Sequence, residues 1–183
     1  MEKVFFQAKL LFKSSNEDFG SSMMTVYDYD KDGDQDILYT NGDAFDYIPP
    51  QGRPWHGANI LENKGNLNFE FRRLCYLTGT TYMKPADVDN DGDVDFFAVS
   101  TWNLWDDPEA QSMVWLENID NVQFVKHNIT NNPSHLLCCE PGDYNGDGLI
   151  DVVTCGMHTF PPYDRLGRIT LWLNNGVLNK GNN

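Results

Sequence analysis

The sequence predicts an all-β fold: a β-propeller made of four-stranded antiparallel blades, with three blades in this chain. Three observations support this. A nine-residue acidic string begins at residues 28, 87 and 143, so its copies start 59 and 56 residues apart. A similar series of short apolar runs accompanies each copy. These runs are rich in β-branched and aromatic residues, are separated by Gly, Asn and Pro, and show no sustained helical spacing. A four-stranded sheet that recurs in this way is typical of a propeller blade.

The composition excludes several classes of protein. The 183 residues carry a formal net charge of −14 but are 40% hydrophobic, which is too apolar for an acidic disordered chain. A deficit of Lys and Arg argues against nucleic-acid binding, because phosphate recognition needs a basic surface. No apolar run approaches the ~20 residues of a membrane-spanning helix. The first apolar run is interrupted by Gln7, Lys9 and Lys13, so we expect no secretory signal within this chain.

The predicted strands follow in the same order in each unit. The first strand precedes the acidic string (23–26, 82–83, 136–139) and the second follows it (37–39, 96–99, 152–154). The third ends in an amide (60–63, 115–118, 172–175), and the fourth opens with a phenylalanine (Phe69, Phe124). We therefore expect blade 1 at 20–75, blade 2 at 78–130, blade 3 at 134–176 and a tail at 177–183.

The third unit stops before a fourth strand, whereas residues 1–12 read as an outer strand without a blade. We expect residues 1–12 to complement the last blade. Because closed propellers use about four to eight blades, three should be completed by another chain or by a longer parent protein. Head-to-tail self-association would give a six-bladed ring or a filament, and a longer propeller is the alternative.

The acidic strings have the donor chemistry of calcium loops. They share Asp at the first, fifth and ninth positions, Asp or Asn at the third, and Gly at the sixth. In an extended strand, alternate carboxylates would lie ~6.6 Å apart on one face and repel one another. The glycine permits a turn that returns the ninth residue to them. An all-oxygen set suits Ca²⁺ better than Mg²⁺, and Zn²⁺ would require Cys or His. An EF-hand would need Glu at the twelfth position, which is Tyr39, Ala98 and Thr154 here.

This pattern of an Asp-x-Asp-x-Asp-Gly-x-x-Asp string, an apolar strand, a Leu-Glu-Asn strand and a Phe-led strand resembles the FG-GAP/VCBS repeat family. That family includes the calcium-binding propeller blades of integrin α-subunits and of many secreted microbial proteins. The resemblance implies up to three structural Ca²⁺ ions, the third held more weakly. It implies these ligands: Asp28, Asp30, Asp32, Asp34, Asp36; Asp87, Asp89, Asp91, Asp93, Asp95; Asp143, Asn145, Asp147, Leu149, Asp151. The seventh residue of each string (Asp34, Asp93 and Leu149) would contribute its carbonyl.

The loops after the second strands are aromatic and should emerge together, opposite the calcium loops. Exposed aromatic side chains there would suit stacking on a glycan or a protein interface, although such residues can also pack between blades as core. The candidate ligand-binding residues are Tyr47, Trp55, His56, Trp102, Trp105, His158 and Tyr163.

The expected function is a calcium-binding module for extracellular binding or assembly, with a protein or glycan ligand. We find no catalytic constellation and expect no enzyme. The alternatives are a domain of a carbohydrate-active enzyme, such as a polysaccharide lyase, or a structural subunit of an extracellular polymer. The calcium demand favours an extracellular or periplasmic location. We expect the four cysteines to be buried thiols.

Overall fold

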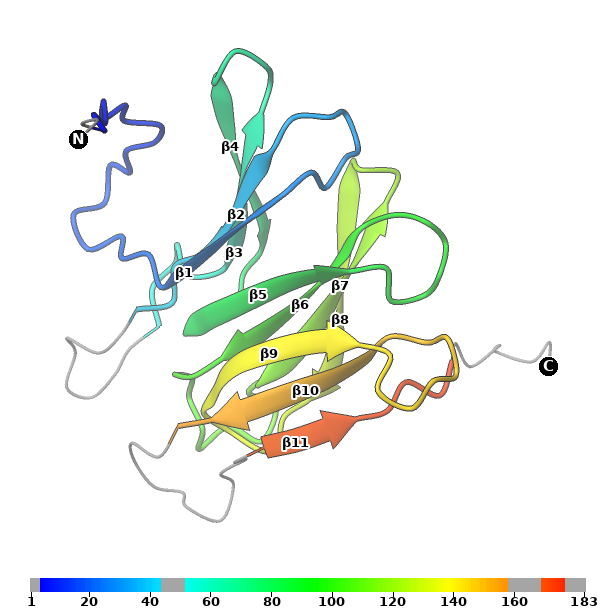
Figure 1. The fold of residues 1–183 in the computed structure, drawn as a ribbon. Helices are drawn as coiled ribbons and strands as arrows, with labels where there is room; N and C mark the ends of the chain where they lie inside the picture. The colour runs from blue at the N-terminus through cyan, green and yellow to red at the C-terminus, as the bar shows by residue number, and fades with distance from the viewer. Residues whose placement is uncertain (1–3, 44–51, 158–168, 177–183) are drawn as a thin grey trace.

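The computed structural model describes residues 4–43, 52–157 and 169–176. These residues form eleven strands in three antiparallel sheets, without a helix (Figure 1). The all-β prediction is confirmed, and the sheets are consistent with propeller blades. The described residues form no closed ring. None of their segments is a helix long and apolar enough to cross a membrane.

Each sheet is a meander in which neighbours in sequence are neighbours in space. The first contains β1 (Met23–Tyr27), β2 (Asp36–Thr40), β3 (Ala58–Asn63) and β4 (Phe69–Cys75). The second contains β5 (Thr80–Ala86), β6 (Asp95–Ser100), β7 (Met113–Ile119) and β8 (Gln123–Thr130). The third contains β9 (Leu136–Gly142), β10 (Asp151–Gly156) and β11 (Ile169–Trp172).

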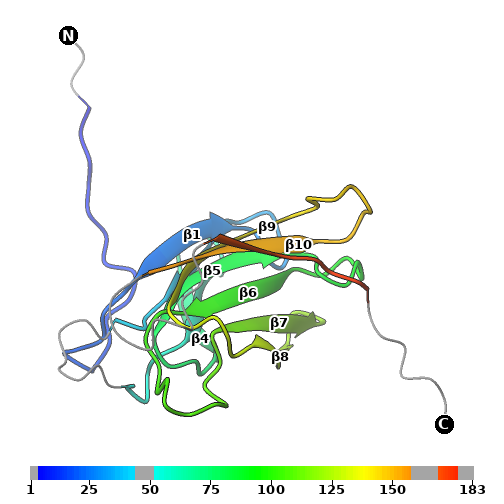
Figure 2. The same ribbon diagram turned by 90° about the horizontal axis from the view of Figure 1, so that it is seen from below.

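The second sheet lies between the other two and packs against both (Figures 1 and 2). Successive residues of a strand point to opposite faces, so adjacent residues of β6 enter different cores. Phe96 packs with Leu38 and Ile60 against the first sheet. Phe97 packs with Leu136 and Val152 against the third. This explains why all six residues of β6 are buried.

The two ends of the chain were predicted to supply a separate outer strand and a tail. Residues 4–13 form no strand in the single chain, and residues 1–3 and 177–183 lie outside the described residues. The pairing of residues 1–12 with a last blade therefore stays a prediction. The third sheet has three strands among the described residues.

Candidate metal centre

Each acidic string forms the loop between the first two strands of its sheet. The loops follow β1, β5 and β9, and all three lie at the same end of the stacked sheets, on the right in Figure 1. The sheet meander places them there because every first strand runs in the same direction across the stack.

The loops fold through hydrogen bonds from backbone N–H groups to their own carboxylates. In the second loop, Asp91 N donates to Asp89 Oδ1 at 3.3 Å and Asp93 N donates to Asp91 Oδ1 at 2.8 Å. Gly92 N donates to Asp87 Oδ2 at 3.2 Å. Gly92 has a φ of +95°, and a Cβ there would meet nothing within 4 Å, so the conformation rather than space requires glycine.

The ninth residue of each string has a structural role that sequence reasoning missed. In the second loop, Asp95 Oδ2 accepts from Val88 N at 3.1 Å, and Oδ1 accepts from Asn118 N at 2.7 Å. Burial raises the pKa of Asp36 and that of Asp95 to about 6. The donors are backbone N–H groups, which any residue supplies, so no residue type in the sequence indicated this contact.

Carboxylate oxygens gather in the first two loops. Single oxygens of Asp28, Asp30 and Asp36 lie within 4.8 Å of one another. The same holds for Asp87, Asp89 and Asp91. Like charges this close repel one another, and their repulsion is relieved when a cation lies between them.

One oxygen in each of these two groups lacks a partner. Asp28 Oδ1 and Asp87 Oδ1 are buried and accept no hydrogen bond from the described residues. A buried anionic oxygen without a partner is costly unless a cation satisfies it. The all-oxygen donor set and these two oxygens therefore fit a hard divalent cation.

The third loop satisfies its own carboxylates. Asp143 Oδ1 accepts from Gly146 N at 2.7 Å, and Oδ2 accepts from Gly148 N at 3.0 Å. These hydrogen bonds lower the pKa of Asp143. Asn145 Nδ2 donates to Asp147 Oδ2 at 2.8 Å. Among the described residues no group of three carboxylates forms here like those of the first two loops.

Side chains at the fourth loop position connect neighbouring loops. Lys31 Nζ donates to the carbonyl of Gly92, and Asn90 Nδ2 donates to that of Gly148 at 3.4 Å. The three loops thus form a continuous row across the sheets. These contacts were not foreseen, because the fourth position varies among the repeats.

At the opposite end, the structure describes four of the seven predicted ligand-binding residues, and three of these four are buried. His56, Trp102 and Trp105 are buried, and Trp55 is half-buried. The rings of Trp102 and Trp105 lie 6.0 and 5.3 Å from that of His135. The three buried side chains therefore form no exposed aromatic surface and match the alternative of packing between blades. Tyr47, His158 and Tyr163 lie outside the described residues.

The chain was compared with models of known protein families. Residues 87–154 match the FG-GAP-like repeat, from the second acidic loop through the third loop and into β10. No curated protein matches the chain. The matched stretch carries the repeated loop chemistry, which confirms the resemblance predicted from the sequence.

Proposed function

We propose that this chain, whose residues 87–154 match an FG-GAP-like repeat, is a calcium-binding propeller-type module for extracellular or periplasmic binding or assembly. The observation that carries the proposal is the pair of buried oxygens, Asp28 Oδ1 and Asp87 Oδ1, which accept no hydrogen bond from the described residues. Each belongs to a group of three carboxylates.

Calcium is the ion that this donor set favours. Every side chain in the two carboxylate groups offers oxygen to a metal, and Ca²⁺ accepts six to eight oxygens in flexible geometry. Asp28, Asp30 and Asp36 would hold the first ion, and Asp87, Asp89 and Asp91 the second, together with the further ligands implied by the family resemblance. The bound ion would supply positive charge that neutralises the repelling carboxylates.

The proposed role of the ion is structural. The ninth aspartate of each loop is hydrogen-bonded to its own loop and to the end of the third strand. Lys31 and Asn90 connect each loop to the next. A loop ordered by the ion would therefore fix the first three strands of its sheet relative to one another, and would also fix the acidic loop of the neighbouring sheet. Weak calcium sites of extracellular modules fill at on the order of 10⁻⁴–10⁻³ M, which supports the proposed location.

Thermal unfolding of the full chain with calcium or with EGTA tests this function. We expect calcium to raise the melting temperature, because a ligand at 100 times its dissociation constant adds about 2.7 kcal/mol to the free energy of unfolding. Magnesium at the same concentration should add less.

Two variants of one loop make the test specific. Asp87→Asn removes a charge and replaces one oxygen of the carboxylate by NH₂, whereas Asp93→Asn makes the same change in a side chain outside the carboxylate group. Asp87→Asn should lose much of the calcium-dependent stabilisation, and Asp93→Asn should keep most of it. If both variants lost the calcium-dependent stabilisation equally, the stabilisation would come from general relief of charge repulsion, and the proposed calcium site would be contradicted.

A further inference from the structure

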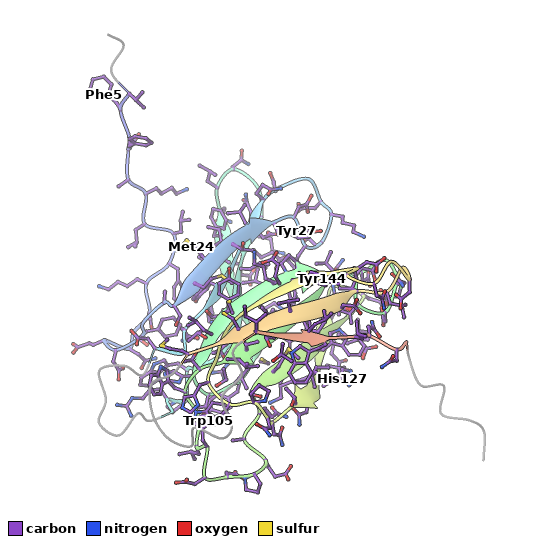
Figure 3. All side chains as sticks on the ribbon, turned by 60° about the horizontal axis from the view of Figure 1, so that its bottom comes forward. Phe5, Met24, Tyr27, Trp105, His127 and Tyr144 are labelled. Carbon is purple, nitrogen blue, oxygen red and sulfur yellow. The ribbon has the colours of Figure 1, made fainter. Side chains whose placement is uncertain are left out.

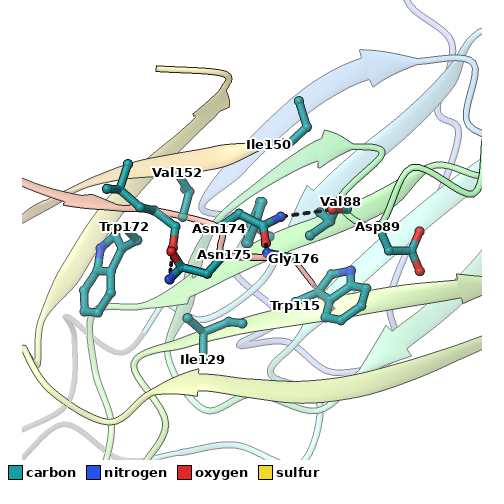
Figure 4. A pocket seen from close by; sticks show the side chains of 12 residues that line it. Val88, Asp89, Trp115, Ile129, Ile150, Val152, Trp172, Asn174, Asn175 and Gly176 are labelled. Atoms are coloured by element: carbon teal, nitrogen blue, oxygen red, sulfur yellow. Dashed lines mark hydrogen bonds between the residues drawn. The ribbon is translucent and has the colours of Figure 1, made fainter. Parts of the chain in front are cut away.

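An apolar pocket of about 710 Å³ lies between the second and third sheets (Figure 4). Trp115 and Ile129 line it from β7 and β8, and Trp172 lines it from β11. Val88 and Val152 also line it. We call this the outer-strand pocket.

The first two sheets show what fills the corresponding place. Phe124, at the start of β8, lies with its ring centroid 6.4 Å from Tyr29 and 5.5 Å from Phe96. In the repeat, Val88 stands at the position of Tyr29, and Val152 at that of Phe96. The outer-strand pocket therefore lies where the leading phenylalanine of a fourth strand would pack on the third sheet.

The third sheet also presents a free edge beside this pocket. Among the described residues, β11 pairs with β10 and with no other strand. Ile169, Leu171 and Leu173 on this edge segment are exposed. An unpaired edge offers a row of backbone donors and acceptors to an incoming strand.

Residues 4–11 have the pattern of such a strand. Phe5 is followed five residues later by Leu10, as Phe69 is by Leu74 and Phe124 by Ile129. Each of these segments precedes an acidic string. Phe5, Phe6 and Leu10 are 85%, 95% and 76% exposed in the single chain, so these apolar side chains lack cover (Figure 3).

The segment points away from the third sheet of its own copy. Phe12 stacks on Phe71 at 4.7 Å and lies 6.4 Å from Tyr39. Tyr39 alternates along β2 with Leu38, which faces the second sheet. Phe12 is thus fixed on the far face of the first sheet, with two sheets between it and β11, and the N-terminal segment extends away from the body (Figure 2).

We propose that residues 4–11 of one copy form the fourth strand of the third sheet in a second copy. They would pair antiparallel with β11 and place Phe5 in the outer-strand pocket. The same contact would bring the second copy over the far face of the first sheet, where Met24 and Val26 are exposed. Because the two surfaces differ, the contact is head to tail and closes into a ring or extends into a filament. This goes beyond the proposed metal function and does not depend on it.

The mass of the full chain in solution, measured by light scattering from about 1 to 100 μM, tests the proposal. We expect assemblies of two or more copies at the upper concentrations, and at least a tenfold weaker self-association for Phe5→Glu. The control Phe6→Glu should assemble like the wild type, because Phe6 stands at the repeat position of Glu70. Both side chains are exposed in the single chain, so neither variant should disturb its fold.

Mixing two defective variants separates strand donation from other association. Phe5→Glu disables the donor, and Val152→Trp fills the acceptor pocket. Each should be monomeric alone, and together they should form a pair with one intact junction. A wild-type monomer at 100 μM, equal effects of Phe5→Glu and Phe6→Glu, or failure of the mixture to pair would overturn the proposal.

Discussion

The carboxylate of Asp95 accepts a hydrogen bond from the backbone N–H of Asn118 at 2.7 Å, and so joins the second acidic loop to the end of β7. The same pair forms in the first sheet between Asp36 and Asn63 at 2.8 Å. Asp151 and Asn174 form it in the third, also at 2.8 Å. The ninth aspartate of the repeat is therefore part of the framework of each sheet.

Asp95→Ala should destabilise the protein even without calcium. It leaves the N–H groups of Val88 and Asn118 without their carboxylate acceptor, and each such loss costs about 1–3 kcal/mol. We expect a loss of about 2–4 kcal/mol, measured by urea unfolding in EGTA. The matched control, Asp93→Ala, should change the free energy of unfolding by less than about 0.5 kcal/mol. Equal effects of the two substitutions would refute the framework role.

Gly79, just before β5, lets the backbone pass close to the segment that follows β6 in the same sheet. Its φ is +65°, and a Cβ there would lie 1.7 Å from the Trp102 carbonyl oxygen. Gly79→Ala should lower the free energy of unfolding by more than about 3 kcal/mol, because strain and a backbone clash combine. Gly92→Ala has similar strain without the clash and should cost about 1–2 kcal/mol. Similar costs for the two variants, measured by urea unfolding, would contradict the close approach.

Stability should fall below about pH 6.5 partly because of His56. Burial lowers the pKa of His56, and Arg53 lowers it further. The unfolded chain titrates near 6.5, so between that pH and the lower folded pKa the unfolded state binds more protons and is favoured. Unfolding of the wild type and His56→Gln in EGTA from pH 7.5 to 5 measures the difference. The variant should lose less stability on acidification, and parallel curves would show that His56 does not contribute.

Cys138 and Cys155 lie opposite each other on β9 and β10 with their sulfur atoms 2.7 Å apart. All four cysteines are free thiols; Cys139 is buried as predicted, whereas Cys75, Cys138 and Cys155 are half-buried. With excess glutathione disulfide as oxidant, this pair should lose two protons and two electrons and form a disulfide. Burial raises the pKa of Cys138 to about 11, so the reaction should be slow at neutral pH.

Thiol counting checks the cysteine pair. The wild type should decrease from four free thiols to two, and peptide mapping should find Cys138 joined to Cys155. Cys138→Ser should form no internal disulfide under the same conditions. A bond that involves Cys75 instead would contradict the geometry.

The repeats made much of the fold predictable. The strands around the acidic strings follow from alternating apolar runs and turn residues, and the carboxylates at the first and third loop positions gather as expected. The sequence left open whether Trp102 and Trp105 are exposed or packed between blades, because their burial depends on contact with His135, which immediately precedes β9. The third loop satisfies its own carboxylates with hydrogen bonds, whereas the sequence predicted only that it would bind calcium more weakly. One reason is Asn145, because its side-chain amide donates to the carboxylate of Asp147, which would otherwise be available to a cation.

Equilibrium dialysis against calcium tests the central claim most directly, because it counts the ions bound per chain. Two ions should bind at sub-millimolar calcium, through the loops of Asp28 and Asp87, and a third should bind only at higher concentration. Asp87→Asn should remove one of the two, and Asp93→Asn should remove neither. Binding of no calcium by the wild type at millimolar concentration would contradict the account.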